Sequence, residues 1–400
     1  MRVVILGAGQ AGAWVALTLR EAAPEVQITL IGAEALPPYE RPPLSKAVLA
    51  GADVSTALIR PAEFQAGAGV DLRLGTRALH IDRGARCVHL SQGGPIAYDK
   101  LVLATGSAPR RLQVPGAELP HVRVLGDAED ALDLRARLRP GLRVVCLGAG
   151  FVGLEFAAMA VRAGAEVTVL DTAARALGRV LPAEVAEVLV ARHRAEGVRF
   201  AFNVGVTMIT PEAVRSTAGD IPADLVLMGI GSRPRTELAE AAGLVCDDGV
   251  MTDEFGRASD PDIFAVGDIS RHPNPLLGRT IRLESWANAQ NQGIAVARAL
   301  AGGQEPYAEL PAFWTEQYDW MVQMAGLPAA HDRLIWRGMP GDRSFLAMQM
   351  LGDRVVGAIG FNAARDIRVL RGLILGGRPA DVAFLADPTR NLLRYPKDAA

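Results

Sequence analysis

Residues 144–171 read VVCLGAGFVGLEFAAMAVRAGAEVTVLD, and this stretch decides the fold. A short apolar run, 144–147, precedes glycines at 148, 150 and 153, spaced G-x-G-x-x-G. An apolar segment with small residues follows, and a second apolar run, 167–170, ends in Asp171. The pattern predicts a buried strand, a glycine turn, a helix and a second strand.

This unit has the chemistry of a dinucleotide site. Gly148 permits the sharp turn, Gly150 lets backbone approach a pyrophosphate, and Gly153 lets helix and strand pack closely. The helix N-terminus attracts the phosphates. Asp171 is placed to accept from ribose hydroxyls and repels a 2′-phosphate, which favours NADH over NADPH. Arg175 is either a phosphate partner or, as we prefer, a solvated loop charge.

Composition bounds the protein class. A chain of 400 residues suggests roughly two or three domains. Half of the residues are apolar, as in an α/β enzyme, and the net charge of −2 argues against a nucleic-acid partner. The cysteines at 87, 146 and 246 lie far apart and the histidines lack ligand spacing, so neither a disulfide framework nor a metal site is expected. No segment predicts a membrane span or a targeting sequence, and a cytoplasmic location is expected.

The first 34 residues repeat the central plan. An apolar run at 3–6 precedes Gly7, Gly9 and Gly12, and a second run ends at residue 31. Two fingerprints imply two dinucleotides. Gly32 occupies the position of the ribose-binding acid, so we assign that role to Glu34, against the alternative of an exposed loop acid.

The next segment, residues 37–46, reads PPYERPPLSK. Its four prolines predict a stiff, extended stretch that cannot be helix interior. Such a segment is suited to hold Arg41 and Lys46 near a cofactor, where a cation would stabilise the charge of a reduced flavin. The alternative for Lys46 is an ordinary cation at a helix start.

The remaining patterns predict an α/β fold with two Rossmann-like dinucleotide-binding domains. Residues 70–100 alternate apolar and polar and predict a small antiparallel sheet, and residues 311–400 predict a C-terminal α+β domain. Residues 262–268, DIFAVGD, predict a strand that returns to the first domain. The predicted domains are therefore 1–107 with 235–310 for FAD, 108–234 for NAD, inserted in the first, and 311–400.

The chain resembles the FAD-dependent, NADH-using ferredoxin reductases of aromatic-ring dioxygenase and cytochrome P450 systems. The resemblance rests on GAGQAG, RPPLSK, LATG, GAGFVGLE, DIFAVGD and ESWANAQNQGIAVA, and it covers nearly the whole chain. It implies a glutathione-reductase-like fold with FAD and NAD(H) as cofactors. The residue patterns and the resemblance together assign to FAD Gly7, Gly9, Gly12, Glu34, Arg41, Lys46, Ala104, Thr105, Gly106, Asp268, Glu284, Ser285 and Trp286. They assign to NADH Gly148, Gly150, Phe151, Val152, Gly153, Glu155, Asp171, Gly229, Ile230 and Gly231. Gly32 at the first acid position is a departure from the family pattern, so Glu34 rests on the residue argument alone.

The resemblance also implies that Glu155 faces the flavin near Lys46. Independently, a carboxylate one turn into an apolar helix needs a cation partner, and Lys46 is the candidate. We hypothesise that the pair flanks the nicotinamide pocket and has a catalytic role. The alternative is a structural acid that the helix dipole favours.

The implied reaction is electron transfer from NADH through FAD to a [2Fe-2S] ferredoxin that serves a Rieske oxygenase or a P450. No cysteine precedes Cys87, which disfavours thiol chemistry. Two alternatives stay open: reduction of a small acceptor such as a quinone or ascorbyl radical, and a slow flavoprotein resembling apoptosis-inducing factor. The protein is expected to be a monomer or homodimer. A basic segment is a candidate ferredoxin-docking face, with an ordinary solvated surface as the equal alternative. Its basic residues are Arg365, Arg368, Arg371, Arg378, Arg390, Arg394 and Lys397, against Asp366, Asp381, Asp387 and Asp398.

Overall fold

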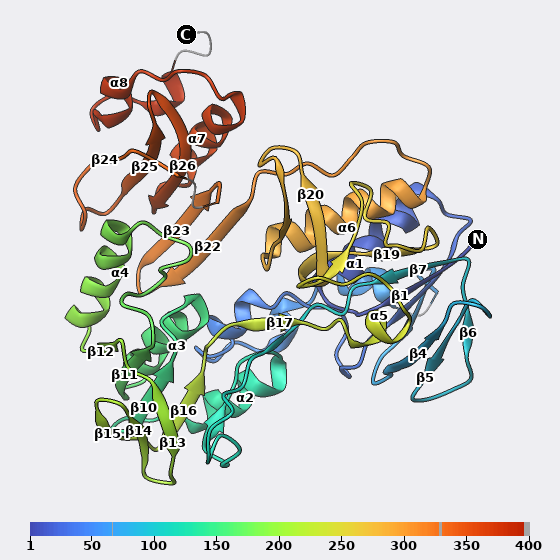
Figure 1. The fold of residues 1–400 in the computed structure, drawn as a ribbon, viewed down its shortest axis with the longest axis horizontal. Helices are drawn as coiled ribbons and strands as arrows, with labels where there is room; N and C mark the ends of the chain where they lie inside the picture. The colour runs from blue at the N-terminus through green and yellow to red at the C-terminus, as the bar shows by residue number, and fades with distance from the viewer. Residues whose placement is uncertain (66, 328–329, 396–400) are drawn as a thin grey trace. The chain divides into compact units, whose positions relative to one another are not determined.

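The computed structural model describes residues 1–65, 67–327 and 330–395, and its backbone divides into two compact units (Figure 1). Unit 1 contains Met1–Pro42, Asp53–Ala108 and Ser232–Glu309. Unit 2 contains Pro43–Ala52, Pro109–Gly231 and Leu310–Ala400. Because the last ninety or so residues cluster with the second nucleotide-binding region, the three-domain division expected from the sequence stays a prediction.

A parallel five-stranded sheet in the order β19-β7-β1-β2-β3 is the centre of unit 1. The side chains of Val3, Val4 and Ile5 are all buried, as expected for a strand covered on both faces. Helices α1 and α6 pack against each other, and a Cβ at Gly293 would come within 2.7 Å of the Ala11 carbonyl oxygen, so only glycine permits this approach. The strands and helices named here are β1 (Arg2–Leu6), β2 (Gln27–Ile31), β3 (Val70–Arg73), β7 (Lys100–Leu103), β19 (Ile263–Ala265), α1 (Gln10–Ala22) and α6 (Trp286–Leu300).

One prediction for residues 70–100 is wrong in part. The segment Val70–Arg73 pairs in parallel with β2 and completes the nucleotide-binding sheet, because Val70 is buried in that core. The antiparallel sheet is smaller than expected and contains β4 (Ala78–Asp82), β5 (Cys87–Leu90) and β6 (Ile96–Ala97). The other elements of unit 1 are η2 (Val54–Ala57), η3 (Pro61–Phe64), β8 (Ser107–Pro109), β17 (Ser232–Pro234), α5 (Glu237–Ala241), β18 (Val250–Met251), η4 (Gly267–Ile269), β20 (Ser270–Asn274) and β21 (Arg279–Arg282).

Unit 2 contains a second parallel sheet in the order β12-β11-β10-β16-β9. Strand β10 pairs in parallel with β11 and with β16, which confirms the predicted strand, glycine turn, helix and strand of residues 144–171. Its elements are β9 (Val122–Arg123), α2 (Ala128–Arg137), β10 (Arg143–Leu147), α3 (Phe151–Arg162), β11 (Glu166–Asp171), α4 (Ala183–Ala195), β12 (Arg199–Phe202), β13 (Val206–Ile209), β14 (Ala213–Ser216), β15 (Gly219–Pro222) and β16 (Leu225–Met228).

The C-terminal part of unit 2 is an antiparallel sheet in the order β22-β23-β26-β25-β24, followed by helices, as an α+β region requires. Trp320, Phe345 and Phe361 of this sheet pack into the same core as residues of α3 and β10. The elements are β22 (Ala312–Gln317), β23 (Trp320–Ala325), β24 (Arg333–Arg337), β25 (Phe345–Leu351), β26 (Arg354–Phe361), α7 (Ala364–Gly376), α8 (Val382–Ala386) and η5 (Leu392–Arg394).

The proline-rich segment contains bends at Pro38 and Arg41 and ends in η1 (Pro42–Ser45), a short 3-10 turn. Proline is tolerated there because the first residues of a helix donate no internal hydrogen bond. Lys397 and Asp398, two residues of the predicted basic segment, lie outside the described residues. Among the described residues, no helix combines the length and apolarity that crossing a bilayer demands.

Candidate active site: two glycine cradles and a buried lysine–glutamate pair

The first fingerprint forms a cradle at the end of β1 in unit 1. Gly7 has a φ of +117°, and a Cβ there would overlap the carbonyl oxygen of Ala104. A Cβ at Gly12 would overlap the oxygen of Gly7. A Cβ at Gly9, by contrast, would meet no atom within 4 Å. Two glycines are thus required for packing, and the middle one faces open space at the N-terminus of α1, as a pyrophosphate site requires.

The second fingerprint in unit 2 has the same geometry. A Cβ at Gly148 would overlap the oxygen of Gly229, and one at Gly153 would overlap the oxygen of Gly148. A Cβ at Gly150 would again have nothing within 4 Å. Phe151 and Val152 open α3 beside this space, and Val152 is 41% exposed. Both fingerprints therefore fit a dinucleotide, and the two parallel sheets place each one at a strand carboxyl end.

The two cradles differ in their acids. In unit 2, the Asp171 carboxylate accepts from the backbone N–H of Ala149 (2.7 Å) and of Ala173 (2.8 Å), so it is fixed against the cradle itself. The guanidinium of Arg175 donates to the carbonyl oxygens of Leu181 (2.9 Å) and Gly178 (3.0 Å), which fits the loop role that we preferred.

In unit 1, Gly32 leaves the usual acid position without a carboxylate, and Glu34 lies two residues farther along the chain. Glu34 is held by Arg41 (2.6 Å) and by the hydroxyl of Tyr39 (2.5 Å). The structure thus brings together Arg41 and Glu34, two residues that the sequence analysis assigns to the FAD site. Their contact with the ribose stays a prediction.

Other residues assigned to FAD gather at the end of β7 and at η4. Ala104, Thr105 and Gly106 follow β7, and the Thr105 hydroxyl donates to the carbonyl oxygen of Arg235 (3.0 Å). The Ser107 hydroxyl donates to the Asp268 carboxylate (2.8 Å). Burial nevertheless raises the pKa of Asp268 to about 6, with a smaller contribution in the same direction from the nearby Glu284 carboxylate. A buried carboxylate of this kind has unused acceptor capacity for the hydroxyls of a sugar chain.

Helix α6 begins at Trp286, and Glu284 and Ser285 directly precede it. The Ser285 hydroxyl caps the helix by accepting from the N–H of Asn288 (3.1 Å). Glu284 is exposed and pairs with Arg282 (2.5 Å). Gln292 of the same helix accepts from the N–H of Gly267 (2.7 Å), where φ is +74°. This bond fixes the turn that carries Asp268, so α6 positions that carboxylate indirectly.

The predicted pair of Lys46 and Glu155 is present in unit 2. The Lys46 Nζ lies 2.8 Å from the Glu155 Oε2, and the two side chains are 12% and 6% exposed. Hydroxyls of Ser45 and Thr315 also donate to Glu155, the latter at 2.6 Å. The Lys46 ammonium lies 4.8 Å from the ring centre of Trp314. Glu155 is therefore a buried, fully partnered carboxylate, and its cation comes from the proline-rich segment as expected.

A chain of hydrogen bonds that the sequence analysis missed continues from Glu155. The Gln317 amide donates to the Thr315 hydroxyl (3.1 Å), and the Gln317 oxygen lies 2.8 Å from Nε2 of the buried His193. Nδ1 of His193 lies 2.8 Å from the Tyr318 hydroxyl. The Gln317 oxygen can only accept, so the proton of the His193 ring is on Nε2 and is donated to Gln317. Nδ1 of His193 then accepts from the Tyr318 hydroxyl. Every donor in the chain then points toward Glu155.

This chain requires a neutral histidine, and burial lowers the pKa of His193 to about 4. Tyr318 has a φ of +59°, an uncommon conformation for a bulky residue. Its ring packs against His193 and against the Arg192 guanidinium, which holds the strained turn in place. The only sequence signal was the T-x-Q spacing, which puts both polar side chains on one face of β22, and it is too common to identify a network.

Comparison with known proteins agrees with this geometry. The model of the pyridine nucleotide-disulphide oxidoreductases matches residues 1–293, and that of the reductase C-terminal region matches residues 312–395. The ferredoxin–NAD(+) reductase component of the anthranilate 1,2-dioxygenase system of Burkholderia cepacia is 43% identical over 98% of both chains.

Two solved structures are similar along their whole lengths. The ferredoxin reductase for the CYP199A2 system from Rhodopseudomonas palustris has a TM-score of 0.94 at 38% identity, covering 98% of this chain and 99% of that one. The putidaredoxin reductase in its covalent complex with putidaredoxin has a TM-score of 0.92 at 38% identity, covering 98% and 97%. These similarities confirm the predicted fold and the resemblance stated from the motifs.

Proposed function

The chain belongs to the pyridine nucleotide-disulphide oxidoreductase family, and from that premise we propose that it is a reductase that passes electrons from NADH through FAD to a [2Fe-2S] ferredoxin. It is an oxidoreductase with FAD and NAD(H) as cofactors. The observation that carries the proposal is the pair of matched glycine cradles, each with a middle glycine open to a pyrophosphate. A Rieske oxygenase or a P450 would be the final consumer of the electrons.

The bound cofactors supply the conversion of a two-electron donor into a one-electron donor, which an iron–sulfur acceptor requires. The contribution of this chain is binding and electrostatics. We propose that the Lys46 ammonium stabilises negative charge on the reduced ring system and that Glu155 sets the position of that ammonium. The hydroxyls of Ser45 and Thr315 keep the Glu155 carboxylate oriented, because both donate to it.

The residues of the cradles and the loops around them bind and orient the cofactors in this proposal. We assign Gly9 and Gly150 to the two pyrophosphates, and Glu34 and Asp171 to the two adenosine riboses. Asp268 accepts from the sugar chain of FAD, and Trp286 lies by the flavin. Gly229, Ile230 and Gly231, which follow β16, cover the nicotinamide nucleotide. A cytoplasmic location and a monomeric or homodimeric state belong to the same proposal.

A thiol acceptor is disfavoured by the chain itself. Disulphide-reducing members of this family need a reactive cysteine pair near the flavin lysine, and this sequence has no cysteine before Cys87. Cys146 is buried within β10, and burial raises its pKa to about 12, so it is inert as a nucleophile. The electrons must therefore leave to an external acceptor.

The basic segment of the C-terminal region is the proposed docking face. Arg365, Arg368, Arg378 and Arg394 are exposed, whereas Arg371 donates to the carbonyl oxygen of Leu310 and Arg390 pairs with Asp387. The exposed arginines suit an acidic ferredoxin, and charge of this kind acts mainly on the association rate.

The deciding experiment compares acceptors of the purified yellow holoenzyme. NADH should drive rapid reduction of one or more [2Fe-2S] ferredoxins, with slow transfer to oxygen. Fast turnover with a quinone and none with ferredoxins would replace the proposal by small-acceptor reduction. Slow oxidation of NADH with every acceptor would indicate a flavoprotein whose role is association.

The docking face has its own test. The double variant Arg365→Gln/Arg368→Gln should slow ferredoxin reduction at low salt and lose much of the salt dependence. Arg215→Gln, which removes an exposed arginine of β14, is the matched control and should leave both unchanged. Equal behaviour of the two variants would reject docking on this segment.

A further inference from the structure

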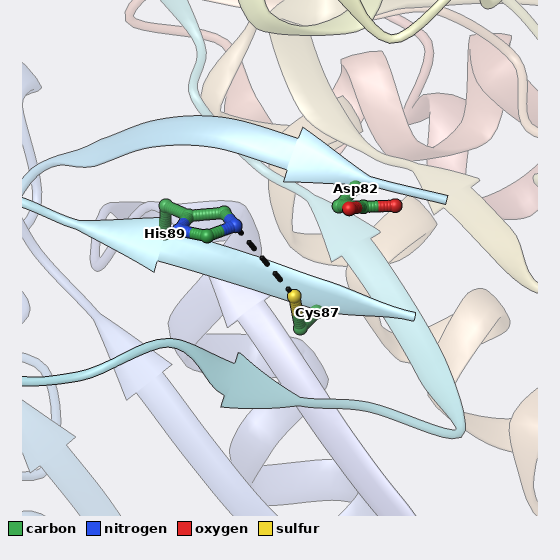
Figure 2. A group of neighbouring side chains, drawn as sticks. All are labelled: Asp82, Cys87 and His89. Atoms are coloured by element: carbon green, nitrogen blue, oxygen red, sulfur yellow. Dashed lines mark hydrogen bonds between the residues drawn. The ribbon is translucent and has the colours of Figure 1, made fainter. Parts of the chain in front are cut away.

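The outward face of the β4–β5 hairpin in unit 1 gathers four metal-binding side chains. Figure 2 shows Asp82 on one strand and Cys87 and His89 on the other, with the imidazole and the thiol turned toward each other. His80 is the fourth member. We call these four residues the hairpin cluster, and none of them belongs to the cofactor sites described above.

The register of the strands places the four side chains together. His80 pairs with His89 and Asp82 pairs with Cys87 across the two strands. Residues two apart in a strand share a face, so all four project to one side. The opposite face carries Ile81, Val88 and Leu90, which are buried in the core. The hydrophobic pattern thus determines which face of the hairpin is exposed to solvent, and the four residues with metal-binding side chains all lie on that face.

The distances suit a small tetrahedral site. One ligand atom from each of Asp82, Cys87 and His89 lies within 4.8 Å of the others, and Sγ of Cys87 is 3.8 Å from Nε2 of His89. Zinc bonds of about 2.3 Å to sulfur and about 2.0 Å to nitrogen at a tetrahedral angle imply a separation of about 3.5 Å. The rings of His80 and His89 have centres 5.7 Å apart, but His80 lies outside the group whose ligand atoms are all within 4.8 Å of one another, so its ring would have to turn toward the ion to supply a fourth ligand.

The charges around the cluster leave its carboxylate available. Two arginines flank the turn, but Arg83 pairs with Asp260 and Arg86 with Asp262. In the described parts of the chain, no cation pairs with Asp82. One oxygen of Asp82 accepts from the backbone N–H of Ala85 (2.9 Å), which orients the group as an outer-shell contact does at metal sites.

We propose that the hairpin cluster binds one divalent zinc-class ion through Cys87, His89 and Asp82, with His80 or a water molecule as the fourth ligand. Thiolate and imidazole select borderline metals such as Zn²⁺ over Mg²⁺ and Ca²⁺, which prefer oxygen. Binding releases the Cys87 thiol proton to solvent and leaves a thiolate on the metal. Because the ligands come from both strands, the ion would tie β4 to β5.

The spacing of histidines and cysteines along the chain predicts no metal site. His80 and His89 are nine positions apart, and only the hairpin register makes them neighbours. The inference is independent of the proposed electron-transfer function, since either can fail without the other.

The test uses the untagged holoenzyme, dialysed against a chelator and then titrated with zinc chloride. One equivalent of zinc should bind tightly. Cys87→Ser and His89→Ala should each lower the zinc affinity by about 100-fold, because loss of a direct ligand should cost at least as much as the largest losses seen for outer-shell changes. Cys246→Ser is the matched control, because this cysteine is also partly exposed but lies outside the cluster. His80→Asn decides the fourth ligand: weaker binding assigns His80, and unchanged binding assigns water.

X-ray absorption at the zinc edge provides a readout that does not depend on affinity. The wild-type spectrum should contain one sulfur at about 2.3 Å with nitrogen or oxygen neighbours at about 2.0 Å. The sulfur should be missing in Cys87→Ser, whose flavin absorbance and NADH oxidation should equal those of wild type. Absence of tight zinc binding, or binding that Cys87→Ser leaves intact, overturns the proposal.

Discussion

The two glycine cradles have one shape and two chemical surroundings. In each, the first and third glycines pack against backbone oxygens and the middle glycine faces open space. The equivalent position two residues after the third glycine is Trp14 in α1 and Glu155 in α3. Trp14 is partly buried beside Arg60, whereas Glu155 is buried and has three hydrogen-bonded partners. The glycines therefore determine the kind of ligand that each cradle binds, and the residues around them determine the chemical role of each cradle.

The largest effect is expected from the third glycine of each cradle. Gly12→Ala should yield a colourless, destabilised protein, and Gly153→Ala should remain yellow but lose NADH-driven flavin reduction. The added Cβ overlaps a backbone oxygen in both, so the cost should lie at the upper end of the range for overpacking, at about 3 kcal/mol. Flavin absorbance and thermal unfolding measure both. The reverse outcome would exchange the cofactor assignments of the two cradles.

The next largest effect should come from Glu155→Gln. The change leaves the Lys46 ammonium buried without its anion, and breaking such a pair costs about 3 kcal/mol or more. Flavin reduction by NADH in a stopped-flow experiment should slow at least tenfold, by about 1.4 kcal/mol of barrier. Glu184→Gln is the control, since Glu184 is an exposed acid in the first turn of α4. An unaltered rate in Glu155→Gln would reduce Glu155 to a structural acid.

Asp268 gives unit 1 a pH-dependent stability. Its folded pKa of about 6 lies above the ordinary 3.8, so the folded state binds the proton more tightly than the unfolded state. Stability without flavin should fall as the pH rises from about 4 to about 6, by roughly 2 to 3 kcal/mol. Asp268→Asn should unfold at a higher urea concentration than wild type at pH 7, and at the same urea concentration as wild type at pH 4. A difference in unfolding free energy between the two proteins that stays the same at pH 4 and pH 7 would contradict this prediction.

The smallest effects on stability should come from the middle glycines. Because a Cβ at Gly9 or Gly150 meets no protein atom, both alanine variants should fold as stably as wild type. Gly9→Ala should lower the affinity for FAD, and Gly150→Ala should raise the KM for NADH, each by about 10- to 100-fold, since the methyl group occupies the pyrophosphate position. Calorimetry and steady-state kinetics distinguish the two. Loss of stability without loss of affinity would show that the cradles bind something else.

The sequence was most informative where a local rule fixes the backbone. The G-x-G-x-x-G spacing placed both cradles correctly, and the need of Glu155 for a cation identified Lys46 across more than a hundred residues. Reasoning failed for Val70–Arg73, because an alternating pattern does not reveal whether a strand joins a parallel or an antiparallel neighbour. The polar chain through His193 was also not predicted, because its members come from α3, α4, β22 and the turn after β22.

The amino-acid sequence by itself determined the two nucleotide-binding folds, their cofactor class and the residue types of the candidate site, because glycine spacing and apolar periodicity act within a few residues of each other. Only the tertiary structure decided which polar side chains meet. Thr315 donates directly to Glu155, and Tyr318 is linked to it through His193 and Gln317, because helix packing brings these residues within hydrogen-bonding distance. His80 and His89 become neighbours through strand register. Contacts of this kind depend on the whole fold, and no local pattern encodes them.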